Sequence, residues 1–93
     1  MFDISSDQFQ LNPNYRLQYE DAQECHVLLY PEGLVKLSET AVAILTRCTS
    51  PTNGIDVIAG LQRTYPDAES LPADVMEFLI DAQSQSWIVA VED

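Results

Sequence analysis

The sequence predicts an α+β domain of winged helix-turn-helix-like architecture, in which a three-stranded antiparallel sheet is followed by a three-helix bundle. Two observations predict this fold. Between residues 15 and 37, short runs of apolar and alternating residues are separated by turn-forming residues, which is typical of strands. From residue 38 onward, apolar residues recur at three- and four-residue spacing, which is typical of helices. A length of 93 residues indicates one domain with one small core.

Residues 1–13 are predicted to form a flexible N-terminal tail, and residues 14–93 to form the single domain. The tail is polar, carries Asp3 and Asp7 and ends in Asn12-Pro13. Its apolar residues could nevertheless let it dock, and they are Phe2, Ile4, Phe9 and Leu11.

The first strand is predicted at Tyr15–Tyr19, where large and polar residues alternate. Residues 25–37 predict two further strands joined by a Pro31-Glu32-Gly33 turn. The last of these, Leu34–Leu37, alternates around a lysine and has two interpretations. It is either an edge strand that its charge keeps soluble, or an edge kept open for an incoming peptide strand.

The first helix is predicted at about residues 38–48, with Ser38 as its N-cap. The second helix has two possible starts. Asn53 can cap it with Asp56 three residues later, or Ser50 can cap it with Pro51 at the first helical position. Pro66 requires this helix to end near Tyr65.

The third helix is predicted to begin at Ser70 or Leu71, with Pro72 in its first turn. Its core face is expected to contain Leu71, Val75, Phe78, Leu79 and Ala82. A second apolar stripe contains Met76, Ile80 and Trp87 and makes the apolar face wider than a three-helix core needs. Residues 87–91 then predict either a short last strand or an extended arm, and we favour the arm.

Charge and composition exclude several classes of protein. Four basic residues stand against fifteen acidic ones, giving a formal charge of −11, which disfavours nucleic-acid binding. No apolar run approaches the ~20 residues of a membrane span, and no secretory signal is present, so we expect a soluble cytoplasmic protein. The two cysteines, Cys25 and Cys48, lack C-x-x-C spacing and are expected to be reduced.

The sequence contains no set of residues typical of an enzyme. His26 is the only histidine, and as the strand neighbour of Cys25 it points to the opposite face of the sheet. A lone histidine among scattered acids does not predict a metal site, and the three glycines are isolated rather than gathered in a phosphate-binding loop. We therefore predict no enzymatic activity, no metal and no cofactor.

Three segments together carry a family resemblance: YRLQYEDAQECHVLLYPEGLVKLSETAVAIL at 15–45, LQRTYP at 61–66 and DVMEFLIDAQSQSWI at 74–88. They resemble the PqqD family of pyrroloquinoline quinone (PQQ) biosynthesis. The likeness covers about residues 14–88, and its most specific element is the LLYPEG run followed by Lys36-Leu37 and the first helix. One departure is Thr49-Ser50, where the family usually has Asp-Gly.

The resemblance implies a peptide chaperone, a peptide-recognition element of the pathways that modify ribosomally made peptides (RiPPs). Such a protein would bind the precursor peptide PqqA by strand addition and present it to the radical S-adenosylmethionine enzyme PqqE. Carried onto this chain, the peptide-binding residues are Leu34, Val35, Lys36 and Leu37 on the strand and Met76, Leu79, Ile80 and Gln83 on the third helix. A monomer and a homodimer both stay possible.

Two other functions agree with the residues alone. The helix pair is compatible with a winged-helix DNA-binding regulator, although the charge opposes it. The apolar residues of the tail and of the Trp87–Val91 arm are compatible with a self-associating structural module.

Overall fold

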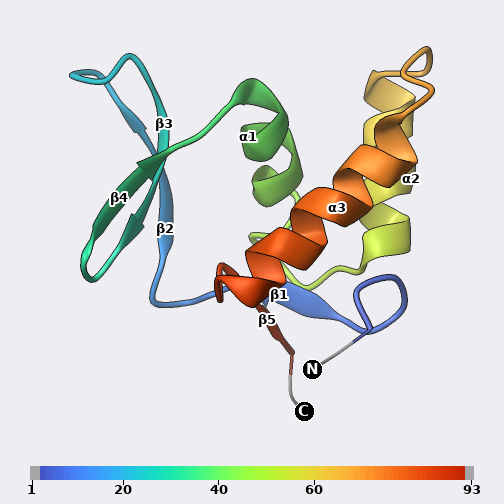
Figure 1. The fold of residues 1–93 in the computed structure, drawn as a ribbon, viewed down its shortest axis with the longest axis horizontal. Coiled ribbons are helices and arrows are strands. Elements are labelled where there is room, and N and C mark those ends of the chain that lie inside the picture. Colours follow the sequence, from blue (N-terminus) through green and yellow to red (C-terminus); the bar gives the residue numbers. More distant parts are fainter. Residues whose placement is uncertain (1–2, 92–93) are drawn as a thin grey trace.

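The structure is a computed structural model that describes residues 3–91. In chain order its elements are β1 (Phe9–Leu11), β2 (Arg16–Glu20), β3 (Cys25–Tyr30), β4 (Gly33–Lys36), α1 (Glu39–Thr46), α2 (Gly54–Thr64), α3 (Leu71–Ser84) and β5 (Ile88–Ala90). The mixed α+β class predicted from the sequence is confirmed. Figure 1 shows β2, β3 and β4 on one side of the molecule and the three helices beside them.

The predicted three-stranded antiparallel sheet is confirmed, with the strand order β2-β3-β4. Its central strand carries two adjacent residues with no exposed surface, Val27 and Leu28. Neighbouring side chains of a strand point to opposite faces, so both faces of β3 are covered at this point. The apolar run in the sequence correctly indicated a strand buried on both sides.

A second sheet, which the sequence did not predict, joins the two ends of the described chain. β1 pairs antiparallel with β5, so Phe9 lies opposite Ala90. We favoured an extended arm for residues 87–91, and this choice was wrong because residues 88–90 form a paired strand. The signal was missed because the partner strand lies at the opposite end of the sequence.

Residues 3–13 belong to the folded domain, in contrast to the flexible tail expected from their polarity. Phe9 is completely buried and Ile4 almost so, and both lie in the main core. The Phe9 N–H donates to the Thr52 carbonyl, and the Leu11 N–H donates to the Cys48 carbonyl. These bonds hold the edge of β1 that does not pair with β5. Phe2, the other apolar residue of the expected tail, lies outside the described residues.

The loop before β1 also closes the N-terminus of α2. The Gly54 N–H donates to the Ile4 carbonyl at 2.8 Å, and the Ile55 N–H donates to the Ser5 carbonyl at 3.2 Å. The Asn53 side chain accepts from the Asp56 N–H at 2.9 Å. Three amides that a helix leaves without an internal partner are therefore satisfied. Asn53 is the cap, and the alternative start at Ser50 was wrong.

The other helix ends follow the predictions closely. Ser38 caps α1 by accepting from the Ala41 N–H, and α1 ends two residues earlier than expected, at Thr46. α2 ends before Tyr65, and α3 begins at Leu71 with Pro72 in its first turn. The core joins the inner sheet face to the helices through Leu28, Ile44, Leu45, Leu61, Val75, Leu79 and Ile88.

Candidate functional site

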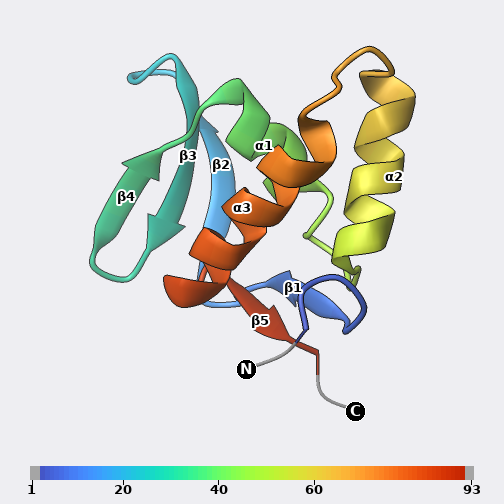
Figure 2. The same ribbon diagram turned by 45° about the vertical axis from the view of Figure 1, so that its right-hand side comes forward.

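β4 is the open edge of the three-stranded sheet. It pairs with β3 on one side, and no described strand pairs with its other side. Figure 2 shows β4 at the outer border of the sheet. An edge strand leaves half of its backbone N–H and C=O groups available to another chain.

The register identifies which of these groups point outward. The Leu37 N–H donates to the His26 carbonyl at 3.0 Å, so Leu37 and His26 form a hydrogen-bonded pair. Hydrogen-bonded and non-bonded pairs alternate along an antiparallel ladder. Val35, opposite Leu28, therefore directs its backbone groups to β3, whereas Leu34 and Lys36 direct theirs to the open edge.

The predicted strand residues differ in what their side chains can contact. Leu34 is 43% exposed and Lys36 is also exposed, so both side chains are accessible. Val35 is half-buried against the core. Leu37 is only 8% exposed, follows the end of β4 and belongs to the core. Its N–H donates to the His26 carbonyl of β3, so neither the side chain nor the N–H of Leu37 is available to a peptide.

The predicted residues of α3 differ in how accessible their side chains are. Ile80 is 57% exposed, whereas Leu79 is completely buried and cannot contact a peptide without repacking of the core. Met76 packs partly against the core. At 100° per residue, Met76, Ile80 and Gln83 lie within about 60° of one another around α3. The second apolar stripe is therefore split between the core and the surface.

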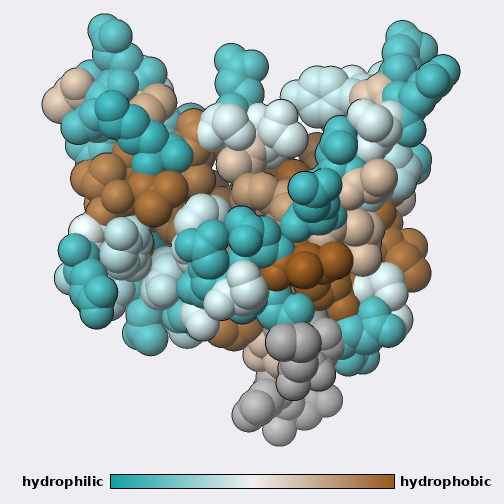
Figure 3. Space-filling view, viewed as in Figure 1, coloured by the Kyte–Doolittle hydropathy of each residue, from teal (hydrophilic) through white to brown (hydrophobic). Residues whose placement is uncertain are grey.

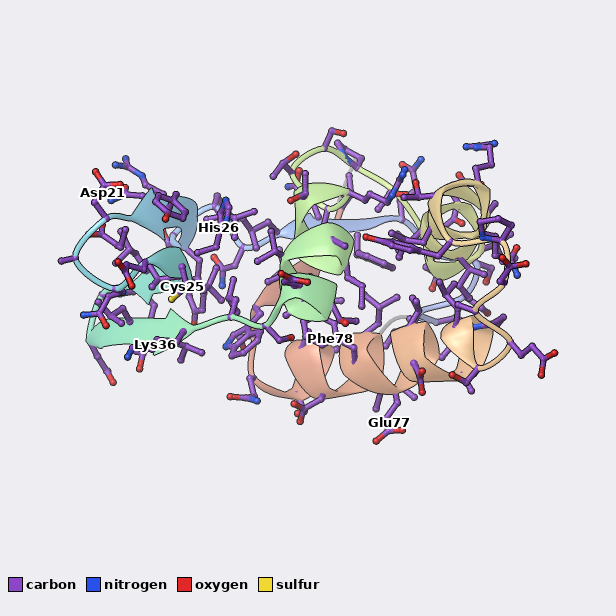
Figure 4. The ribbon with its side chains drawn as sticks, turned by 90° about the horizontal axis from the view of Figure 1, so that it is seen from above. Asp21, Cys25, His26, Lys36, Glu77 and Phe78 are labelled. Carbon is purple, nitrogen blue, oxygen red and sulfur yellow. The ribbon has the colours of Figure 1, made fainter. Side chains whose placement is uncertain are left out.

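The structure shows a groove along α3 and α1 that sequence reasoning missed. It is lined by Thr40 of α1 and by Asp74, Glu77, Phe78, Ile80, Asp81 and Ser84 of α3. Only Ile80 was among the predicted site residues. In Figure 4, β4 with Lys36 and α3 with Glu77 follow the same side of the molecule, and Phe78 points toward α1. The three acids of the groove recur at helical spacing. Any solvated helix face shows the same pattern, so the sequence alone does not distinguish them.

A cleft of about 270 Å³ continues this groove between the three helices. Thr40 and Asp74 line both hollows, and the cleft adds an apolar wall of Ala43, Leu61, Leu71 and Val75. Figure 3 shows apolar surface over β3 and β4. The arrangement offers backbone pairing at β4 and an acidic, partly apolar groove beside α3.

The Cys48 thiol and the His26 ring both make structural contacts. The Cys48 thiol donates to the Ile44 carbonyl, and burial raises its pKa to about 12. Cys25 and Cys48 are both free thiols. His26 stacks edge-on against Tyr19, with ring centroids 5.2 Å apart. Within residues 3–91 no three His, Cys, Asp or Glu side chains gather as metal ligands.

The family of the chain follows from comparison with known proteins. Residues 25–88 match the family described as coenzyme PQQ synthesis protein D (PqqD). The chain belongs to the PqqD family. This confirms the resemblance carried by the strand, turn and helix segments of the sequence.

Proteins named PqqA binding protein are similar to this PqqD family member over most of their length. The Azotobacter vinelandii protein is 44% identical over 79 residues, which are 85% of this chain and 86% of that protein. The Klebsiella pneumoniae protein is 49% identical over 78 residues, which are 84% of this chain and 85% of that protein.

A solved structure from the PqqD family has the same fold. It is the solution NMR structure of the PqqD truncation of Methylobacterium extorquens PqqCD, described as a functional, stand-alone RiPP recognition element. Its TM-score is 0.72 at 27% identity, and the match covers 91% of this chain and 92% of that one. None of the helices within residues 3–91 has the length and apolar character needed to cross a membrane.

Proposed function

We propose that this protein is a peptide chaperone of PQQ biosynthesis that binds the precursor peptide PqqA by strand addition to β4 and presents it to PqqE. In this role the protein is a non-catalytic cytoplasmic recognition element whose β3–β4 hairpin acts as the wing of a winged-helix domain. The similarity to proteins named PqqA binding protein supports the choice of peptide.

The observation that carries the proposal is the open edge of β4. The outward backbone groups of Leu34 and Lys36 are two donors and two acceptors at the spacing that an extended peptide requires. Main-chain pairing supplies affinity in such complexes, and side-chain pockets supply selectivity. The groove beside α3 is the nearest candidate for such a pocket, with Phe78 and Ile80 as its apolar contacts.

Charge also supports peptide binding over DNA binding. The groove carries the carboxylates of Asp74, Glu77 and Asp81, and they would repel a phosphate backbone. The same carboxylates would attract a basic residue of a peptide that continues past β4 onto α3.

Replacement of Lys36 by proline tests strand addition directly. The Lys36 N–H points away from β3, so Lys36→Pro removes an outward donor and leaves the β3–β4 hydrogen bonds in place. We expect PqqA to bind at least about tenfold more weakly, through the lost hydrogen bond and the steric effect of the ring on the added strand. Fluorescence anisotropy with labelled PqqA measures the affinity.

Two control variants separate the backbone effect from other effects. Lys36→Ala removes the side chain and keeps the donor, so it should bind more tightly than Lys36→Pro. Val35→Pro removes a hydrogen bond to Leu28 inside the sheet and should lower stability instead. Unchanged affinity in a folded Lys36→Pro protein would refute strand addition at β4. Recruitment of PqqE is a separate step from strand addition at β4. It is therefore assayed separately, by co-sedimentation of PqqE with the PqqA-bound protein.

A further inference from the structure

The face of the three-stranded sheet that points away from the helices has a chemistry of its own. Val27 is completely buried but lies outside the main core cluster. Strand alternation places Val27 and Leu29 on the face opposite to Leu28, which does belong to that cluster. This outer face therefore contains a small apolar centre separate from the main core.

Two rows of the outer face cross all three strands and reach β4. In one row Arg16 lies opposite Leu29, which lies opposite Leu34. In the other row Gln18 lies opposite Val27, which lies opposite Lys36. The edge strand thus ends one row with an exposed leucine and the other with an exposed lysine.

The outer face is cationic in a protein that is otherwise acidic. Two of the four basic residues in the whole chain, Arg16 and Lys36, lie on it. Neither forms an ion pair within the residues that the structure describes. Arg47, by contrast, donates to the Gly60 carbonyl on α2. Glu20 is the acid of this face, and it accepts a hydrogen bond from the Gln18 amide.

We infer that this outer face favours peptide strands that add antiparallel to β4 and carry the sequence acid-x-apolar. The inference rests on the proposed strand addition and names the side chains that the edge prefers. In an antiparallel pair, residues directly opposite each other point to the same face. The peptide residue opposite Lys36 therefore lies beside its ammonium group, and the residue opposite Leu34 continues the row of Leu29.

The order of the two residues follows from the strand direction. β4 runs from Leu34 to Lys36, so an antiparallel peptide reaches Lys36 first and Leu34 two residues later. The residue between them lies opposite Val35 and points to the helix side of the sheet. The acidic groove beside α3 lies on that side, so the two faces of the peptide meet opposite charges.

Charge reversal on both partners tests the inference. Each Asp and Glu of PqqA is replaced in turn by Lys, and each peptide is titrated against the wild-type chain and against Lys36→Glu at low salt. One acid is expected whose replacement weakens binding to the wild type and is rescued by Lys36→Glu. A favourable cross-strand pair corresponds to about a two- to fivefold change in Kd, and the coupling should fall as salt is added.

The apolar position is tested in the same way. The peptide residue two places after the coupled acid is replaced by Ser, and its effect should be smaller in a Leu34→Ser chain than in the wild type. Arg63→Glu, a charge reversal on α2, is the matched control and should rescue no peptide.

The outcomes separate this inference from the proposed function. If Lys36→Pro weakens PqqA binding but no acid couples to Lys36, strand addition stands and the outer-face selection is overturned. Coupling of an apolar residue two places before the acid would overturn the antiparallel direction. If Lys36→Pro binds as tightly as the wild type, the proposed function itself fails.

Discussion

Replacing Gly54 with alanine is expected to detach the N-terminal loop from α2. An alanine Cβ at this position would lie 2.6 Å from the Ile4 carbonyl oxygen and 3.2 Å from the Ser5 Cα. Both atoms belong to the backbone, so no side-chain rotation relieves the overlap. The loop must move, and it then loses the contacts that hold it on the helix.

The magnitude follows from those contacts. The loop accepts hydrogen bonds from Gly54 and Ile55, each contributing about 1 kcal/mol to stability. Ile4 is 6% exposed, and burial of such a side chain contributes about 1.5–3 kcal/mol. Full detachment should therefore lower the free energy of unfolding by about 3.5–5 kcal/mol. For a domain of this size the melting temperature should fall by more than about 10 °C.

Urea unfolding followed by tryptophan fluorescence measures this loss. Trp87 is the only tryptophan and packs against Phe78, with ring centroids 6.2 Å apart, where α3 meets β5. Gly60→Ala in the same helix is the matched control, because its Cβ would meet only the flexible guanidinium of Arg47. A Gly54→Ala protein as stable as Gly60→Ala, within about 0.5 kcal/mol, would refute the idea that residues 4–5 are an integral part of the fold.

Three further predictions concern the thiols and the charge. At pH 8 iodoacetamide should modify the half-buried Cys25 and leave Cys48 unmodified, as mass spectrometry of the folded protein can show. Equal alkylation of both thiols would contradict the burial of Cys48. Since burial raises the pKa of the Cys48 thiol from 9.0 to about 12, the folded state favours the protonated thiol, and the free energy of unfolding should decline as the pH rises above 9. A gel shift at low salt should detect no binding to duplex DNA, and a retarded band that disappears at high salt would restore the regulator hypothesis.

The parts of the fold that could be predicted are those with a local signal. Ser38 and Asn53 cap their helices with hydrogen bonds to residues three positions away, so the sequence contains both partners side by side. β1 and β5 are three-residue strands whose partners lie at opposite ends of the chain. Their stability comes from tertiary contacts of Phe9 and Ile88, which no short window of sequence reveals.

The candidate site also has one part that the sequence predicted and one part that it did not. The alternation in Leu34–Leu37 and the preceding turn correctly indicated an edge strand, because strand order in a hairpin follows from proximity. The periodicity of α3 indicated an apolar face but not which neighbours cover it. The core takes Leu79 and part of Met76, and α1 lies beside Phe78, so the groove contains acids that a helical pattern assigns to solvent.

The pairing of β1 with β5 makes the domain a nearly closed loop of chain. The Val91 N–H donates to the Gln8 carbonyl at 3.1 Å, so the chain enters and leaves the fold at one place. Figure 1 shows this place on the opposite side of α3 from the β3–β4 hairpin. Another protein could therefore be joined at either end, or the whole unit inserted into a loop of an enzyme, without covering β4. The covalent linkage of this domain to a partner can therefore change while the β4 edge stays the same.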